Sequence, residues 1–392
     1  MKYIVIVGDG MADYPLRELN GKTPLQEANT PNMDHIAKRG KCGTLSTIPQ
    51  GMKVGSDIAN LSIMGYDPRK YYTGRGPLEA ASIGVTLGEN DLAFRCNIIT
   101  EENGNIKDYC ADHISSEQAE VLIEELNQTL PNIGEFFPGV SYRQLFVLRN
   151  TTQNIVSTPP HDVINGRIKD HLLKPLDNPL VADLNDLILK SNKVLSKHNV
   201  NLERIKKGMN PGNMIWLWGQ GSRPNLEPLQ KKYDLRGAVV TAVDLIKGIG
   251  YYAGMEIINV DGATGYYDTN YEGKAKATVK ALEESDYIYV HVESIDEASH
   301  AGDIDMKLKT IEDLDKRLIG RIIDAKEEDW IIGLLTDHAT PISTRTHSSD
   351  PVPFAIWGGE HDDTKTFNEV SVKNGFYKSL VGDEFMKSLL DT

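Results

Sequence analysis

The chain has 392 residues, of which 40 % are apolar and 25 % charged, a composition typical of ordinary globular proteins. This length exceeds what one hydrophobic core usually covers, so we expect two domains. The net charge of −14 argues against nucleic acid or an anionic membrane surface as a partner, because no basic stripe is present.

Short apolar runs predict strands, and several are almost continuously apolar, as expected when helices cover both faces of a parallel sheet. In chain order the predicted strands are 3–7, 145–148, 214–218, 287–290, 331–335 and 352–357. Amphipathic stretches between and after them predict helices at 115–129, 272–284, 303–323 and 376–390. Ser115 or Ser116 can cap the first helix. This alternation predicts an α/β fold with a doubly wound sheet.

The middle of the chain differs in composition from its two ends. Between residues 87 and 235, Pro, Asn and basic residues become frequent, as in STPPHDVINGR, and candidate metal ligands are absent. We therefore expect residues 87–235 to form a smaller inserted α/β domain. Residues 1–86 and 236–392 would form one discontinuous main domain.

Cysteine content and the N-terminus favour a cytoplasmic protein. Cys42, Cys96 and Cys110 are widely spaced and form no CxxC pair, so we expect reduced thiols. The five-residue apolar run before Gly8 is too short for a signal peptide. No stretch approaches the roughly 18 apolar residues that cross a bilayer, so we expect no membrane partner.

Polar residues that can bind metals follow several predicted strands. Asp9 follows the first strand, Asp296 the fourth and Asp337 the fifth, and in an open α/β sheet such positions share one edge. Carboxylates and imidazoles without a thiolate suit Mn²⁺, Mg²⁺ or Zn²⁺, and so many ligands predict two ions that hold a phosphoryl group. The full candidate set is Asp9, Ser56, Asp296, His300, Asp337, His338 and His347.

Each candidate ligand also has a simpler explanation when it is taken alone. Asp9 could form a turn, Ser56 could be a helix N-cap, and His347 could be a solvated loop residue. Asp296 and His300, four residues apart, could be an exposed pair on one helical face. If Ser56 instead binds a metal at a helix N-terminus, its hydroxyl becomes a nucleophile beside a positive dipole end.

Several common motifs are absent. GDGMAD has Asp13 in place of the third glycine of a dinucleotide-binding GxGxxG, and GSD is not the GxSxG of serine hydrolases. The sequence also lacks the phosphate-binding GxxxxGK[ST] and the HExxH of zinc proteases.

At these motifs the sequence resembles the alkaline phosphatase superfamily, and more closely the archaeal-type cofactor-independent (2,3-bisphosphoglycerate-independent) phosphoglycerate mutases. The resemblance runs nearly end to end, through GDGMAD, GSDIANLSIMGYDP, YYTGRGPLEAASIG, WLWGQG, GATGYYDTNYEGKA, DEASHAGD, TDHATP and RTHSSDPVPFAI. It implies an alkaline-phosphatase-like domain that is interrupted by a substrate-binding insertion.

The resemblance also implies a reaction and roles for residues. The family interconverts 3-phosphoglycerate and 2-phosphoglycerate in glycolysis and gluconeogenesis, with a phosphoserine that matches Ser56. Lys274, in YEGKA, matches a lysine near this serine. Mn²⁺ is the expected metal, with Mg²⁺ or Zn²⁺ as alternatives. One ion falls on Asp296, His300 and His347, and the other on Asp9, Ser56, Asp337 and His338.

The phosphorylated small-molecule substrate carries a carboxylate and a phosphate, which call for guanidinium partners. The candidates are Arg75, Arg95, Arg143 and Arg223, and each could equally form a structural salt bridge. His161 and Asp162 in PPHD could be an oriented acid–base pair that moves protons to the glycerate oxygens.

Three departures from the family pattern leave the phosphoryl acceptor open, and one is that GMKVGSD lacks a proline two residues before the glycine. ESIDEASH has Ile295 where proline is usual and Ser299 where glycine is usual, and both changes spare the ligands. A related branch has been proposed to act as a homoserine kinase in threonine biosynthesis, and these sequence motifs fit that branch as well. A metal-dependent phosphatase is the third alternative. A homo-oligomer also stays open.

Overall fold

The computed structural model describes residues 1–151 and 153–392, which divide into two compact units. Unit 1 comprises Met1–Tyr72 and Asn225–Thr392, and unit 2 comprises Thr73–Pro224. Both junctions lie earlier in the chain than the boundaries expected from sequence. The segment Thr73–Thr86 belongs to unit 2 because its helix α5 (Arg75–Ser82) packs on strands of that unit.

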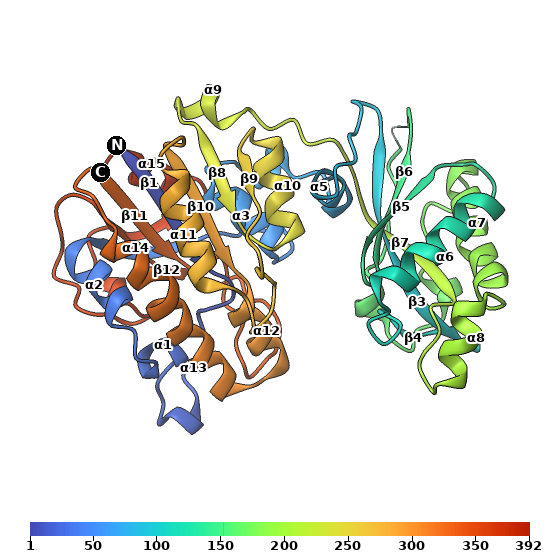
Figure 1. Ribbon diagram of the computed structural model, residues 1–392, viewed down its shortest axis with the longest axis horizontal. Helices are drawn as coiled ribbons and strands as arrows, with labels where there is room; N and C mark the ends of the chain where they lie inside the picture. Colours follow the sequence, from blue (N-terminus) through green and yellow to red (C-terminus); the bar gives the residue numbers. More distant parts are fainter. Residues whose placement is uncertain (152) are drawn as a thin grey trace. The chain divides into compact units, whose positions relative to one another are not determined.

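Unit 1 is built on an eight-stranded sheet with the order β13-β2-β12-β11-β1-β10-β8-β9 (Figure 1). Strand β1 lies between β10 and β11 and is parallel to both, whereas β12 is antiparallel to β11 and to β2. The strands are β1 (Lys2–Gly8), β2 (Lys41–Ser46), β8 (Gly237–Val240), β9 (Glu256–Ile258), β10 (Tyr287–Val292), β11 (Trp330–Leu335), β12 (Val352–Trp357) and β13 (Lys378–Val381).

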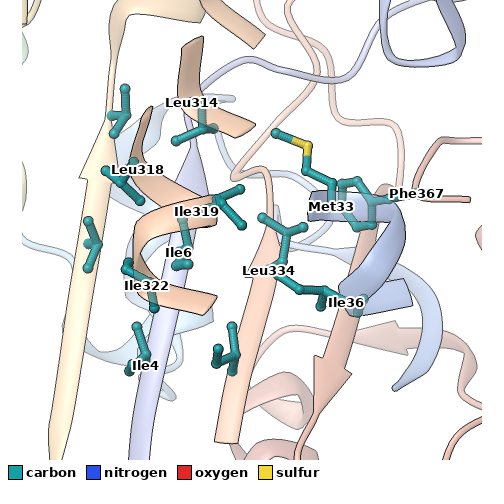
Figure 2. Packing of buried hydrophobic residues seen from close by; sticks show 14 of the residues in the cluster. Ile4, Ile6, Met33, Ile36, Leu314, Leu318, Ile319, Ile322, Leu334 and Phe367 are labelled. Atoms are coloured by element: carbon teal, nitrogen blue, oxygen red, sulfur yellow. The ribbon is translucent and has the colours of Figure 1, made fainter. Parts of the chain in front are cut away.

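Helices cover both faces of this sheet. Leu314, Leu318 and Ile322 pack over Ile4 and Ile6 of β1 on one face (Figure 2). On the other face, a Cβ added to Gly333 would lie 2.9 Å from the ring of Phe385 in the C-terminal helix. The helical elements are η1 (Arg17–Leu19), α1 (Pro24–Glu27), α2 (Pro31–Arg39), α3 (Ser56–Ile63), α4 (Pro68–Tyr71), α9 (Leu229–Tyr233), α10 (Asp244–Tyr252), α11 (Tyr271–Ala281), α12 (Ser294–Ala301), α13 (Ile304–Asp313), the π-helical turn η4 (Leu314–Ile319), α14 (Gly320–Asp324), η5 (Ser371–Asn374) and α15 (Glu384–Leu390).

Unit 2 has an antiparallel sheet of its own with helices packed against it. Strand β3 pairs with β6 and β7, β6 pairs with β5, and β4 pairs with the end of β3. The strands are β3 (Leu92–Glu102), β4 (Asn105–Asp108), β5 (Glu135–Val140), β6 (Arg143–Leu148) and β7 (Met214–Ser222). Besides α5, the helical elements are α6 (Ser116–Thr129), η2 (Pro160–Val163), η3 (Ile168–Asp170), α7 (Pro179–Leu195) and α8 (Asn199–Lys206).

The predicted α/β class and all six predicted strands are confirmed, and Ser115 caps α6 by accepting from the Gln118 amide. The helix predicted over 376–390 is wrong in its first half. Residues Lys378–Val381 form β13, which adds to β2 in parallel, and the helix begins only at Glu384. Gly382, with φ +58°, turns the chain between the two elements.

Cys42, Cys96 and Cys110 are all buried free thiols. None of the helices in the described part of the chain combines the length and apolarity needed to cross a membrane.

Candidate functional site

The sheet order of unit 1 brings three of the predicted ligand segments together. Asp9 follows β1, the helix α12 that carries Asp296 follows β10, and Asp337 follows β11. These three strands are adjacent and parallel, so their carboxyl ends meet at one edge of the sheet. Two groups of candidate metal ligands form there.

The first group joins one helix and one loop. Asp296 and His300 are four residues apart on α12, and Asp296 Oδ2 lies 3.0 Å from His300 Nε2 and 3.6 Å from His347 Nε2. The two imidazole Nε2 atoms are 2.9 Å apart. His300 Nδ1 lies 2.9 Å from the carbonyl oxygen of Arg345, which orients its ring. Three donor atoms therefore converge from His300, His347 and Asp296.

In this group, burial and the neighbouring charges shift the pKa values of Asp296 and His300 in opposite directions. Burial would lower the pKa of His300, but its hydrogen bond to Asp296 and the charge of that carboxylate raise it to about 9. Burial would raise the pKa of Asp296, yet the neighbouring His300 and His347 hold it well below its usual range. A carboxylate next to two imidazoles is a donor set that suits Zn²⁺ or Mn²⁺.

The second group lies at the ends of β1 and β11. His338 Nε2 is 3.0 Å from Ser56 Oγ, 3.5 Å from Asp9 Oδ1 and 3.5 Å from Asp337 Oδ2. Asp9, Asp337 and His338 are buried, and Ser56 is half-buried. Within residues 1–151 and 153–392, no donor hydrogen-bonds to the buried Asp9 Oδ1.

This second group fits a divalent cation. Burial raises the pKa of Asp9 well above its usual range, and the nearby carboxylates of Asp337 and Asp296 raise it further. An unpartnered carboxylate oxygen in such a place calls for a positive charge. A bound divalent cation would supply that charge, and oxygen and imidazole donors suit Mn²⁺, Mg²⁺ or Zn²⁺.

Ser56 is the first residue of α3, and its side chain does not act as the helix N-cap. Gly55 occupies the N-cap position. The Ser56 hydroxyl instead faces His338 Nε2, so the simple capping explanation does not describe this serine. The half-buried serine lies at the positive end of an eight-residue helix.

Two polar residues near this group were missed by sequence reasoning. His291, on β10, is fully buried, and its Nε2 lies 3.2 Å from Asp9 Oδ2. In the described chain neither ring nitrogen of His291 has a hydrogen-bond partner, and His291, Asp9 and Asp337 form a further candidate ligand group. A histidine within an otherwise apolar buried strand was the available signal. Asn60 donates to Asp337 Oδ2 at 3.0 Å and to the Ser56 carbonyl at 2.8 Å, and only its helical spacing from Ser56 hinted at this.

Lys274 lies in α11 and is buried, with its ammonium donating to the His291 carbonyl oxygen at 3.1 Å. Burial lowers its pKa to about 8, although the charge of Glu293 acts in the opposite direction. A buried cation therefore contacts the carboxyl end of β10, the strand next to β1.

In unit 2, two of the proposed substrate-binding arginines and the proposed acid–base residue His161 surround Trp218. The guanidinium carbons of Arg95 and Arg75 lie 4.8 and 5.8 Å from its ring centroid, and the His161 ring meets it edge-on at 5.3 Å. Buried Arg95 also pairs with Glu79 at 3.0 Å. Such stacking of guanidinium groups on an aromatic face fixes their orientation.

The other candidates of unit 2 are placed differently. Arg143 lies 5.9 Å from the ring centroid of Tyr142, whose ring packs against Tyr109. Asp162 Oδ1 is 3.6 Å from His161 Nε2. Arg223 is exposed just beyond the end of β7.

The departures at Ile295 and Ser299 lie within α12 and spare the ligand atoms. Ile295 is buried in the core of unit 1. Ser299 is buried as well, and its hydroxyl donates to the Ile295 carbonyl oxygen at 2.7 Å. Both side chains therefore have structural roles in this helix.

Comparisons with known proteins point to one family. A family model described as 2,3-bisphosphoglycerate-independent phosphoglycerate mutase matches residues 37–201. A Methanothermobacter thermautotrophicus protein named 2,3-bisphosphoglycerate-independent phosphoglycerate mutase 2 is 51 % identical over 395 residues, covering 100 % of this chain and 98 % of that protein.

Two solved structures share the fold. A protein from Pyrococcus horikoshii superposes with a TM-score of 0.87 at 32 % identity, covering 100 % of this chain and 96 % of the other. The cofactor-independent phosphoglycerate mutase from Thermoplasma acidophilum gives 0.66 at 26 % identity, covering 100 % and 99 %. The fold expected from the family resemblance is therefore confirmed over the whole chain.

Proposed function

This chain belongs to the family of 2,3-bisphosphoglycerate-independent phosphoglycerate mutases, and we propose that it carries the transferred phosphoryl group on Ser56. It is an isomerase that interconverts 3-phosphoglycerate and 2-phosphoglycerate, a step of glycolysis and gluconeogenesis. One observation supports the role of Ser56: its hydroxyl lies 3.0 Å from His338 Nε2 in a group of buried candidate ligands drawn from distant parts of the sequence.

The residues present fit two divalent cations. Asp296, His300 and His347 would hold one, and Asp9, Ser56, Asp337 and His338 the other. When bound, the ions would neutralise charge on the phosphoryl oxygens and lower the pKa of the serine hydroxyl. We propose Mn²⁺ as the metal, with Mg²⁺ and Zn²⁺ as alternatives.

The transfer conserves the phosphoryl group. As the bond from Ser56 Oγ to phosphorus forms, the bond from phosphorus to glycerate O3 breaks, and the proton lost by the serine is balanced by one gained at O3. In the second step the bond from Ser56 Oγ to phosphorus breaks as the bond from phosphorus to glycerate O2 forms, and the proton lost by O2 is balanced by one gained at Ser56 Oγ. In our proposal His161, oriented by Asp162, exchanges protons with the glycerate oxygens.

We assign substrate recognition to lysine and arginine side chains. We propose that Lys274 stabilises the phosphoserine and that Arg75, Arg95, Arg143 and Arg223 bind the carboxylate and phosphate of the substrate. The Trp218 face supports this role for Arg75 and Arg95, because stacked guanidinium groups lose little freedom when they bind an anion.

A cytoplasmic location stays a prediction, and the oligomeric state stays open.

The Ser56→Ala variant tests the proposal. We expect mutase activity to fall by several orders of magnitude, on the order expected when a covalent step is lost. Stability should change by at most about 1 kcal/mol, since the side chain caps nothing. Ser62→Ala is the matched control, because Ser62 lies buried on the same helix and its hydroxyl has no hydrogen-bond partner in the described chain.

Phosphorylation of the native protein completes the test. Incubation with labelled 3-phosphoglycerate should leave phosphate on Ser56, detected by mass spectrometry. Substantial mutase activity in Ser56→Ala would refute the covalent route. A native enzyme that ignores 3-phosphoglycerate but phosphorylates homoserine would instead support the kinase alternative.

A further inference from the structure

Thr340 is a fully buried residue in the loop after β11, and its hydroxyl contacts both groups of candidate ligands. It donates to Asp296 Oδ1 at 2.6 Å. The hydroxyl oxygen of Thr340 also lies 3.2 Å from His338 Nδ1. Asp296 belongs to the first group and His338 to the second, so one hydroxyl connects them.

The single proton of the Thr340 hydroxyl determines the direction of its two hydrogen bonds. A threonine hydroxyl has one proton, and here it is donated to the carboxylate of Asp296. The oxygen can then only accept at its other contact, so His338 Nδ1 must carry the proton that is shared with it. In a neutral imidazole this leaves the Nε2 lone pair free. That nitrogen is the one beside Ser56 Oγ at 3.0 Å.

The hydrogen bond also determines how Asp296 is used. With Oδ1 bound to Thr340, the other oxygen, Oδ2, is the one that lies 3.0 Å from His300 Nε2. The hydroxyl therefore selects the ligand atom of Asp296 as well as that of His338. Hydrogen-bond partners of this kind orient metal ligands and set their basicity.

The surrounding backbone holds Thr340 in this position. Its amide donates to the Ala12 carbonyl oxygen at 3.2 Å, and its own carbonyl accepts from the buried ammonium of Lys307 at 3.0 Å. On the other side, a Cβ added to Gly10 would lie only 2.7 Å from the Thr340 hydroxyl oxygen. The side chain thus has little room to move away from Asp296 and His338.

We propose that Thr340 is a positioning residue that couples the two cation sites by orienting one ligand of each through a single hydroxyl. This inference rests on the proposed two-cation function of the site. A threonine that merely satisfies its own buried hydroxyl would need only one of these contacts. Coupling predicts that loss of the hydroxyl weakens both cation sites together.

Calorimetric titration of metal-free protein with Mn²⁺ tests the proposal without reference to catalysis. Native protein should bind two ions per chain, and Thr340→Val, which keeps the side-chain volume, should weaken both sites by about 10- to 100-fold. Thr340→Ser, which keeps the hydroxyl, should bind within a few-fold of the native protein. Thr100→Val is the control, because Thr100 is buried in unit 2 and donates only to the Pro211 carbonyl oxygen.

Each Mn²⁺ titration result that differs from these expectations contradicts a specific part of the proposal. Native protein that binds fewer than two ions would overturn the proposed two-cation function itself. If native protein binds two ions, native-like binding by Thr340→Val overturns the coupling, as does weakening of one site alone. Equal losses in Thr340→Val and Thr340→Ser would assign the effect to packing and overturn the role of the hydroxyl.

A measurement on the native protein covers the case in which Thr340→Val does not fold. With ¹⁵N-labelled histidine and Mg²⁺ bound, the His338 resonances should show a proton on Nδ1 and none on Nε2. His338→Gln identifies these resonances by their loss. A proton on Nε2 would overturn the proposal.

Discussion

Replacement of Gly10 by alanine should damage both stability and cation binding, and the structure separates the two causes. Gly10 has φ +62°, a backbone conformation that costs an alanine about 1–2 kcal/mol. A Cβ there would also lie 2.3 Å from Asp296 Oδ1 and 2.7 Å from Thr340 Oγ1. Relieving such an overlap typically costs a further 1–3 kcal/mol or so, giving about 2–5 kcal/mol in total.

Gly21→Ala is the matched control for backbone strain. Gly21 has φ +80°, and an added Cβ would meet no atom within 4 Å, so we expect a loss of only about 1–2 kcal/mol. Hydrogen exchange of peptides from residues 1–72 measures both losses, and Mn²⁺ calorimetry should show weaker binding in Gly10→Ala alone. Equal stability losses with native Mn²⁺ affinity in both variants would refute the close packing around Asp296.

Three further predictions concern unit 1. Lys307→Met removes the ammonium that lies 2.8 Å from the buried Asp13 carboxylate and should cost about 3–5 kcal/mol in thermal unfolding, partly recovered by adding Asp13→Asn. His291→Phe keeps a buried ring but removes its nitrogens, so calorimetry should show Mn²⁺ affinity about tenfold lower or worse. Burial opposes ionisation of Asp286, but hydrogen bonds, chiefly from Arg236, lower its pKa to about 2. Because the folded-state pKa is depressed below the usual value of about 3.9, the stabilisation is complete above about pH 4 and is lost as the pH falls towards 2. Asp286→Asn should therefore lower stability by about 1 kcal/mol at pH 7, a figure reduced for solvent screening, and by less in acid.

The edge of the sheet could be predicted because it depends on local sequence alone. A buried apolar run followed by a polar residue indicates where a strand ends, as at Asp9 and Asp337. Once such strands are parallel and adjacent, their ends must meet, whatever the intervening chain does. The positions of Asp9, Asp296 and Asp337 are consequences of strand ends.

The hydrogen bonds behind the ligands could not be predicted in this way. His291 contacts Asp9 and Thr340 contacts Asp296, both far away in the sequence, and the local sequence does not show these partners. The helix predicted over 376–390 failed for a related reason. Its first half pairs with β2, more than 300 positions earlier in the chain, and such long-range pairing overrides local amphipathic spacing.

The difference between ligand positions and the hydrogen bonds behind them also determines which substitutions can change cation binding. Asp9, Asp296 and Asp337 follow strand ends, so any sequence that keeps these strands and residues keeps the three carboxylates at one edge of the sheet. Their use depends on residues such as Thr340, which determines which nitrogen of His338 and which oxygen of Asp296 face the ligand groups. A substitution there can leave every candidate ligand in place and still change cation binding. Replacements of the ligands themselves would not reveal this dependence, which is why the valine and serine variants of Thr340 are the sharper probe.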